Sequence, residues 1–152
     1  MLLRILRLPA VILGIAITVA AIVQSRFPFA IGMPSFAVGM TAGAIVMVVA
    51  VAIAVAAMLE MRRHRTTVEP GQTPTALVTS GVFAVTRNPI YVAMLVLVIG
   101  LALMANALWF VVAAAILGIA LDRVVIRGEE RVIEQAFGEP YRAYKRRVRR
   151  WL

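Results

Sequence analysis

The sequence predicts an all-α, polytopic integral membrane protein with about four transmembrane helices, including a C-terminal helical hairpin, and a cytoplasmic amphipathic C-terminal helix. Composition is the first observation: 62% of the 152 residues are hydrophobic and 15% are charged, against about 45–50% and about 25% in soluble domains. The second observation is that the charges are absent from three long apolar stretches. The third is that the basic residues gather in the segments that separate and follow those stretches.

The two N-terminal stretches are residues 8–23 and 36–59. The first follows a basic start, as in a signal peptide, but no small-residue cleavage site follows it, so we expect an uncleaved helix. The second would extend ~36 Å as a helix, enough to cross a bilayer with tilt. Gly39 and Gly43 within it either allow another helix to approach closely or reflect only how common glycine is in membrane helices.

The third stretch, residues 90–121, is too long for one span. It would extend ~48 Å as a helix, whereas the hydrocarbon layer is ~30 Å thick. We therefore predict a hairpin that turns at residues 104–107, with Asn106 in the turn and Trp109 at the membrane interface. Each arm of the hairpin is then short, so we expect both helices to continue into the polar segments that flank the hairpin. The second helix would run past Asp122 to Glu130.

The basic residues predict the orientation in the membrane. With the hairpin, one side receives fifteen of the sixteen Lys and Arg residues and the other side receives only Arg26. The positive-inside rule then places both termini in the cytoplasm, which we expect to border the plasma (inner) membrane. The net charge of +9 is explained by topology and by contact with anionic membrane lipids, so we expect no nucleic-acid partner.

Few residue types remain for chemistry. The chain has no cysteine and one histidine, His64, which excludes disulfides, cysteine nucleophiles and a thiolate or histidine metal site. We therefore assign no metal and no catalytic residue beyond those that position the reactants. The candidates are arginine, glutamate, asparagine and tyrosine side chains on the cytoplasmic side.

The loop before the hairpin ends in Arg87, Asn88 and Pro89. Asn88 suits the N-cap of the next helix and Pro89 its first position. The exposed N–H groups of that helix would suit a carboxylate or a phosphate. Alternatively, Asn88 and Pro89 only begin the helix, and Arg87 reaches a lipid phosphate.

The segment after the hairpin contains an acidic pair, Glu129 and Glu130, and then a helix stop at Gly138 and Pro140. The pair is stabilised either by neighbouring arginines or by a cationic cofactor. A second helix is predicted over residues 141–152, because aromatic and apolar side chains recur there at helical spacing opposite basic ones. We expect that helix to anchor in the membrane interface rather than line a site.

Two motifs resemble a known family. LVTSGVFAVTRNPIY, residues 77–91, and EERVIEQAFGEPYRAYKRRV, residues 129–148, resemble the isoprenylcysteine carboxyl methyltransferase family and its phospholipid methyltransferase relatives. The resemblance covers about the last half of the chain. We treat residues 1–152 as a single membrane domain, with two N-terminal spans in 1–60 and a methyltransferase-like loop, hairpin and C-terminal segment in 61–152.

The resemblance implies a site for S-adenosylmethionine between the loop and the segment after the hairpin. The residues that it places near this cofactor are Leu77, Val78, Phe83, Asn88, Pro89, Tyr91 and Glu129. Those that it places near the acceptor are Arg123 or Arg127, and Glu130, which completes the acidic pair. The family usually has histidine where this chain has Asn88, and an aromatic hydroxyl is common where Phe83 stands.

The implied activity is methyl transfer to a lipid or lipid-tailed acceptor, first a carboxylate of the isoprenylcysteine type and second a phospholipid amine. One alternative is an NADPH-dependent reductase of the steroid and sterol reductase type, which shares a similar C-terminal arrangement. The acidic pair argues against it, because a phosphorylated dinucleotide prefers basic residues. The other alternative is a scaffold or transporter subunit, which ionisable residues inside the spans would favour.

Overall fold

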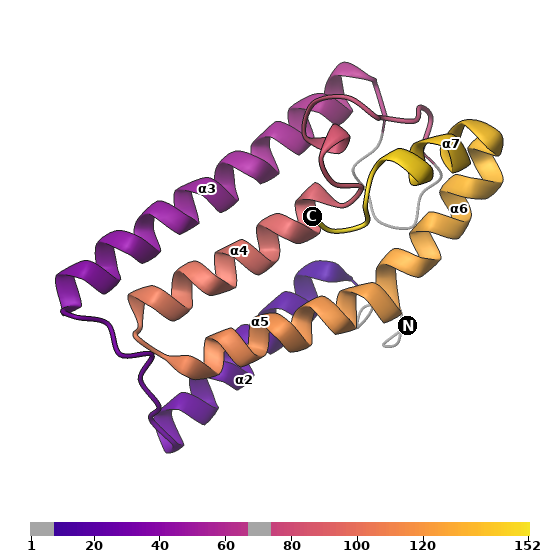
Figure 1. Cartoon of the computed structure of the whole chain (residues 1–152). Coiled ribbons are helices and arrows are strands. Elements are labelled where there is room, and N and C mark those ends of the chain that lie inside the picture. The colour runs from indigo at the N-terminus through magenta and orange to yellow at the C-terminus, as the bar shows by residue number, and fades with distance from the viewer. Residues whose placement is uncertain (1–7, 67–73) are drawn as a thin grey trace.

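A computed structural model describes residues 8–66 and 74–152, in which all regular elements are helical (Figure 1). This confirms the all-α class. The elements are α2 (Pro9–Arg26), α3 (Phe36–Arg63), the short 3-10 helix η1 (Gly81–Ala84), α4 (Pro89–Met104), α5 (Leu108–Leu121), the π-helical turn η2 (Asp122–Ile126), α6 (Arg127–Phe137) and α7 (Glu139–Arg147).

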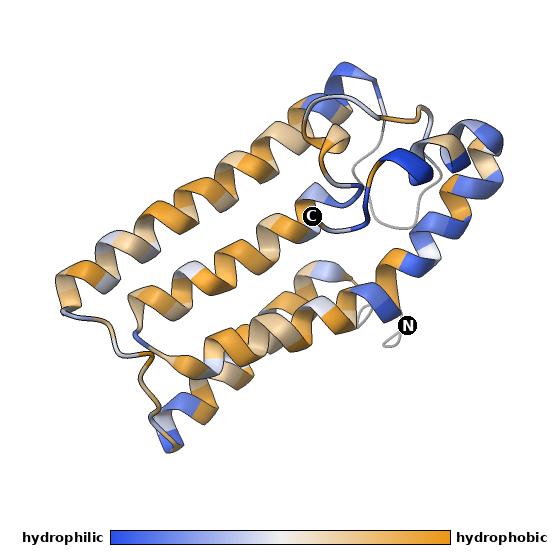
Figure 2. Ribbon diagram, viewed as in Figure 1, coloured by the Kyte–Doolittle hydropathy of each residue, from blue (hydrophilic) through white to orange (hydrophobic). Residues whose placement is uncertain are grey.

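Three helices in the described residues are long and apolar enough to cross a membrane: α2, α3 and the continuous helix Leu108–Phe137. The fourth apolar helix, α4, has 16 residues and a length of ~24 Å. Figure 2 shows that these helices are predominantly hydrophobic along most of α2, α3, α4 and α5. Together they make the chain an integral membrane protein.

The helices pack in pairs, with α3 against α4, α2 against α5, and α4 against α5. Val98, Ala102 and Leu117 are fully or almost fully buried in the shared core. In contrast, Val48 of α3 and Ile119 of α5 are more than half exposed. Exposed apolar side chains of this kind are what a lipid-facing surface requires.

The α3–α4 contact depends on small residues, as one of the two interpretations of Gly39 and Gly43 predicts. A Cβ atom added at Gly43 would lie 2.6 Å from the carbonyl oxygen of Gly100 and 2.7 Å from the amide nitrogen of Met104. Both atoms belong to the backbone of α4, so they cannot move aside as a flexible side chain would. The two helices therefore approach closely only because Gly43 has no side chain.

We expect Gly43→Ala to lower the free energy of unfolding by about 1–3 kcal/mol, because the added methyl group overpacks this contact. Gly14→Ala in α2 is the matched control, since a Cβ atom there would meet nothing within 4 Å. Thermal unfolding of the two purified variants in detergent measures the difference. Equal unfolding temperatures would show that α3 and α4 do not need this contact.

The hairpin turns where the sequence predicts, and Asn106 adopts φ 46° in the turn. Its Oδ1 accepts hydrogen bonds from the backbone N–H groups of Gly32 and Met33, both at 3.1 Å. The indole Nε1 of Trp109 donates to the carbonyl of Phe27 at 2.7 Å. The turn between α4 and α5 is thus fixed to the loop between α2 and α3.

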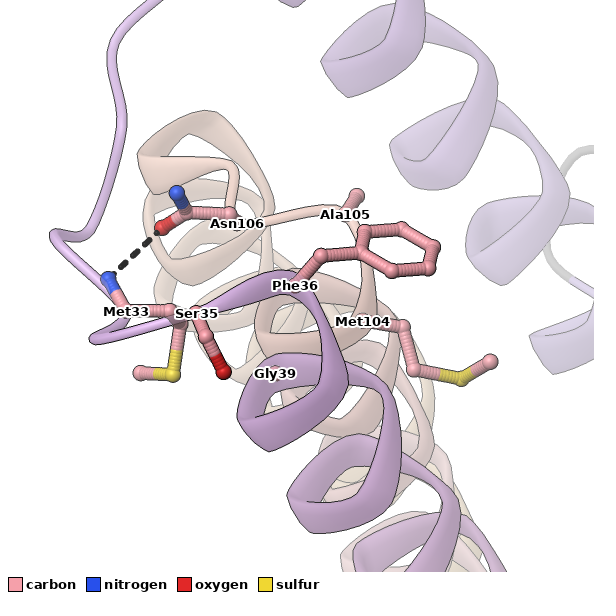
Figure 3. Close-up of a pocket in the computed structure, with 7 residues that line it drawn as sticks. All are labelled: Met33, Ser35, Phe36, Gly39, Met104, Ala105 and Asn106. Atoms are coloured by element: carbon pink, nitrogen blue, oxygen red, sulfur yellow. Dashed lines mark hydrogen bonds between the residues drawn. The ribbon is translucent and has the colours of Figure 1, made fainter.

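A pocket of about 270 Å³ lies at this turn, between the start of α3 and the end of α4 (Figure 3). Its lining consists of Met33, Ser35, Phe36, Gly39, Met104, Ala105 and Asn106. None of these side chains is ionisable, and the hydrogen-bonding oxygen of Asn106 is already engaged by the loop backbone. The pocket therefore offers no groups for the chemistry that the acidic pair suggests, and it lies at the other end of the helices.

The charged residues are concentrated at the end of the molecule that holds α6 and α7 (Figure 2). Arg4 and Arg7, on which the orientation argument also relies, lie outside the described residues. Of the remaining basic residues, Arg26 ends α2 near the hairpin turn. The others lie in the last turn of α3 or just after it, before α4, or beyond α5. The fold therefore separates the basic residues as the alternating spans require.

The last helix extends well beyond the apolar stretch, as predicted. It runs without interruption from Leu108 to Phe137, and it stops at Gly138, whose φ is 56°. The other arm does not extend in this way, because α4 begins at Pro89. The prediction that both arms continue into the polar flanks is therefore right for one arm only.

The end of the chain differs from the predicted helix over residues 141–152. Helix α7 ends at Arg147, and Val148 is already extended, with φ −119° and ψ 132°. Tyr141 and Tyr144 are 2% and 3% exposed and pack against Ile133 and Phe137 of α6. Their aromatic rings face the protein instead of lipid, so α7 forms part of the folded charged end.

Candidate functional site

The two carboxylates of the acidic pair have different partners. Glu130, only 7% exposed, accepts hydrogen bonds from the guanidinium groups of Arg87 at 2.9 Å and Arg150 at 3.1 Å. Arg87 is itself buried, with 10% of its side chain exposed. A buried charge is tolerated only with such partners, so Glu130 is held in place by arginines from two distant parts of the chain.

Arg150 also binds Asp122, with Nη1 2.8 Å from Oδ1. Its hydrogen bond to Glu130 raises the pKa of Arg150 above the ordinary value for arginine, so the guanidinium stays charged. One arginine can reach both carboxylates because of η2. Two turns of an ordinary α-helix take about 7.2 residues, and a π-helical turn takes up one more. The eight positions from Asp122 to Glu130 thus make about two full turns, and both face Arg150.

Glu129 points to a different side, toward α4. The hydroxyl of Tyr91 lies 2.9 Å from each of its carboxylate oxygens, and Tyr91 is only 8% exposed. Among the Asp and Glu side chains in residues 8–66 and 74–152, Glu129 alone forms no ion pair with another described residue. Glu129 is therefore a partly buried carboxylate whose hydrogen-bond partner among the described residues is the neutral hydroxyl of Tyr91.

The turn before α4 binds the end of the chain, residues 148–152, which we call the C-terminal segment. The hydroxyl of Thr86 and the side-chain amide of Asn88 both donate to the carbonyl of Arg150, at 3.1 and 3.0 Å. Arg87 Nη1 donates to the carbonyls of Lys145 and Val148. Asn88 occupies the N-cap position of α4, but its side chain makes no capping hydrogen bond. The predicted position of the cap is therefore right, but the capping hydrogen bond is absent. The Asn88 side chain is instead turned to the C-terminal segment, where its amide N–H donates to the carbonyl of Arg150.

Helix α7 contacts two of the loop residues that the resemblance places near the cofactor, Leu77 and Phe83. The hydroxyl of Tyr144 donates to the carbonyl of Phe83 at 2.6 Å, and Leu77 packs against the cluster of Tyr141, Tyr144 and Val148. Burial raises the pKa of Tyr144 to about 12, so this hydroxyl keeps its proton at neutral pH and can continue to donate. Helix α7 thus braces the loop before α4.

The two arginines proposed to face the acceptor lie on the outside of the α5–α6 junction. Arg127 is 48% exposed and lies 3.0 Å from Asp122, whereas Arg123 is 68% exposed and 3.9 Å from the same carboxylate. Surface pairs of this kind are weak. Both guanidinium groups can therefore turn toward an anion without the loss of a buried contact.

The structure brings together most of the residues that the sequence singled out, but it adds two that the sequence analysis missed. Tyr91 of α4 contacts Glu129 of α6, and Asn88 contacts the backbone of Arg150, whose side chain binds Glu130. Asp122 and Arg150 complete this arrangement. Asp122 had a signal, since it is the first carboxylate after a long apolar stretch. Arg150 had none, because its role requires the chain to reverse at Gly138.

The family model for phospholipid methyltransferase matches residues 38–140. The chain belongs to the phospholipid methyltransferase family. The match begins within α3 and ends at the start of α7, so it includes most of the second span but not residues 141–152. No curated protein and no solved structure matches the chain. Membership in this family makes the protein a membrane methyltransferase.

Proposed function

We propose that the protein transfers a methyl group from S-adenosylmethionine to a lipid-tailed acceptor at the cytoplasmic face of the membrane. The observation that carries the proposal is the carboxylate of Glu129, which is partly buried, bound to the Tyr91 hydroxyl and without an ion-pair partner among the described residues. A partly buried carboxylate in this state is suited to a ligand that brings positive charge or hydroxyl donors.

The residues present fit this cofactor. S-adenosylmethionine carries an ammonium, a sulfonium and ribose hydroxyls. An acidic side chain attracts the two cationic groups and accepts hydrogen bonds from the hydroxyls. Glu129 would hold one of these groups, with Tyr91 fixing the carboxylate. Leu77, Val78 and Phe83 would supply apolar surface to the cofactor. Asn88 and Pro89 would act by shaping the start of α4, since the Asn88 amide is engaged by the C-terminal segment.

The cofactor supplies an activated methyl group, whose bond to sulfur breaks as a bond to the acceptor forms. The enzyme needs alignment and exclusion of water more than an acid or a base. In the proposal Arg123 or Arg127 holds an anionic acceptor by charge-assisted hydrogen bonds. Glu130 contributes by keeping Arg87 and Arg150 in place. This agrees with a site that has no cysteine or histidine.

The first candidate acceptor is a lipid-tailed carboxylate of the isoprenylcysteine type, because two exposed arginines, Arg123 and Arg127, pair only with Asp122 and can bind an anion. A carboxylate attacks directly, and its charge is neutralised by the reaction. The second candidate is a phospholipid amine, which the description of the matching family favours. An ammonium group must first lose a proton, and the same arginines would then bind the phosphate of the headgroup.

The proposed orientation follows from the charged end. Nearly all described basic residues lie there, so the positive-inside rule places it, and both termini, in the cytoplasm. Exposed arginines such as Arg131 and Arg147 would contact anionic lipid at the plasma (inner) membrane. The cofactor would enter from the cytoplasm, and the acceptor would enter from the bilayer.

The test is a methylation assay with purified protein in liposomes and methyl-labelled S-adenosylmethionine. One set of liposomes contains a prenylated cysteine carboxylate, and the other contains phosphatidylethanolamine. A base-labile methyl ester supports the first acceptor, and a base-stable N-methyl product supports the second. If calorimetry detects no binding of S-adenosylmethionine and neither product forms, the proposal is wrong. Thermal stabilisation by NADPH alone would favour the reductase alternative.

A further inference from the structure

The C-terminal segment contacts three parts of the chain that lie far apart in the sequence. The backbone N–H of Arg87 donates to the carbonyl of Arg149 at 3.0 Å, and Thr86 and Arg149 form a parallel bridge. The side chain of Arg150 extends in the other direction, to Asp122 and Glu130. In Figure 1 the C-terminus lies beside the start of α4.

Arg150 is the residue in which these contacts converge. Its carbonyl oxygen accepts from Thr86 and Asn88, on the turn before α4. Its guanidinium binds one carboxylate in η2 and one in α6. The backbone of Arg150 is therefore fixed to α4 while its side chain is fixed to the α5–α6 helix.

We propose that Arg150 is a positioning residue, which docks the C-terminal segment between the turn before α4 and the α5–α6 junction and thereby holds Glu129 against Tyr91. The inference rests on the proposed function only for its effect on cofactor binding. Arg150 itself has no assigned contact with cofactor or acceptor. It acts because Glu130, which it binds, adjoins Glu129 in the first turn of α6.

The charges explain why this matters for Glu129. Two adjacent carboxylates would compete for any nearby cation. Arg87 and Arg150 together engage both oxygens of Glu130, so Glu129 is left with the neutral Tyr91 hydroxyl. Without Arg150, Glu130 and Asp122 each lose a charged partner, and the first turn of α6 is freed to rotate away from α4.

The absence of cysteine from the chain allows a direct test of docking. Val148 is 9% exposed in the docked segment, so a Val148→Cys variant carries a single reporter thiol. We expect slow alkylation of this thiol by a maleimide. Adding Arg150→Gln is expected to accelerate alkylation at least about tenfold. The control Arg147→Gln removes an exposed arginine three residues earlier, and we expect it to leave the rate unchanged.

The second readout is the dissociation constant for S-adenosylmethionine, measured by calorimetry without the reporter cysteine. Arg150→Gln is expected to raise this constant about tenfold or more, because a displaced Glu129 would lose its charge-assisted hydrogen bond to the cofactor. Arg150→Lys keeps the charge but not the planar fork that reaches two carboxylates, so we expect an intermediate effect in both experiments. This variant also decides the question if Arg150→Gln does not fold.

The outcomes separate the two proposals. If wild-type protein does not bind S-adenosylmethionine, the proposed function fails, and the alkylation rates still decide whether Arg150 docks the segment. If wild-type protein binds and the Arg150 variants bind equally well, the proposed function stands and the positioning role is wrong. Unchanged alkylation in the folded Arg150 variants also overturns the inference.

Discussion

Replacement of Glu129 by glutamine is expected to raise the dissociation constant for S-adenosylmethionine about 10- to 100-fold, because a charge-assisted hydrogen bond contributes about 1.5–3 kcal/mol. The substitution keeps the shape of the side chain, and the new amide could still bond to Tyr91, so the change is confined to charge. Methyl transfer at a fixed, low cofactor concentration should fall by a similar factor. Calorimetry and the labelled-methyl assay measure the two effects.

Glu134→Gln is the matched control for this prediction. Glu134 lies on the same helix, and it pairs on the surface with Arg142 and Lys145. The same substitution there should leave cofactor affinity unchanged. The folded state of the Glu129 variant should also be unharmed, because Glu129 has no cation partner to lose among the described residues. Wild-type affinity in the Glu129→Gln protein would remove Glu129 from the cofactor site.

For Glu130 we expect replacement to lower the stability of the fold, which replacement of Glu129 leaves unchanged. Glu130→Gln should lower the free energy of unfolding by about 3–5 kcal/mol, since it leaves the buried guanidinium of Arg87 without its carboxylate. Side-chain exposure is only 9% for Glu130 and 10% for Arg87, so solvent cannot replace the lost partner. Thermal unfolding in detergent, with and without S-adenosylmethionine, measures the loss.

Two further variants make the Glu130 result specific. Glu139→Gln breaks pairs that are exposed on α7, and its unfolding temperature should match that of wild type. Combining Glu130→Met with Arg87→Met removes both buried charges, and this protein should be more stable than the single Glu130 variant. If the Glu130 variant is as stable as the Glu139 variant, the ion pair does not hold the charged end together.

The sequence was sufficient for the parts of the fold that depend on local chemistry. The apolar stretches and the turn around Asn106 could be located because lipid requires continuous hydrophobic helices and a turn requires a break in them. The acidic pair could be identified because carboxylates that follow an apolar stretch need a partner. The extension of the last helix to the stop at Gly138 also followed from residues close together in the chain.

What could not be predicted depends on contacts between distant residues. The sequence suggested that the neighbouring arginines would pair with Glu130, but its partners are Arg87 and Arg150, 43 and 20 positions away. It suggested a helix up to Leu152, but the hydrogen bonds offered by Thr86 and Asn88 favour an extended segment after Arg147. The spacing of side chains in residues 141–152 gives no sign of this competition between a helix and an extended segment.

The π-helical turn η2 makes the charged end sensitive to the length of the chain in a way that side-chain replacement does not test. Adding one residue between Asp122 and Ile126 would rotate α6 by about 100° relative to α5. Removing one residue would instead convert the turn to ordinary α-helix and leave seven positions, again about two turns, between Asp122 and Glu130. With the added residue Glu129 would leave Tyr91, and Asp122 and Glu130 would no longer share a face; with the residue removed they would still share it. Side chains in this stretch can vary among homologous proteins, but we expect a one-residue insertion there to be excluded and a one-residue deletion that removes the π-helical turn to be tolerated.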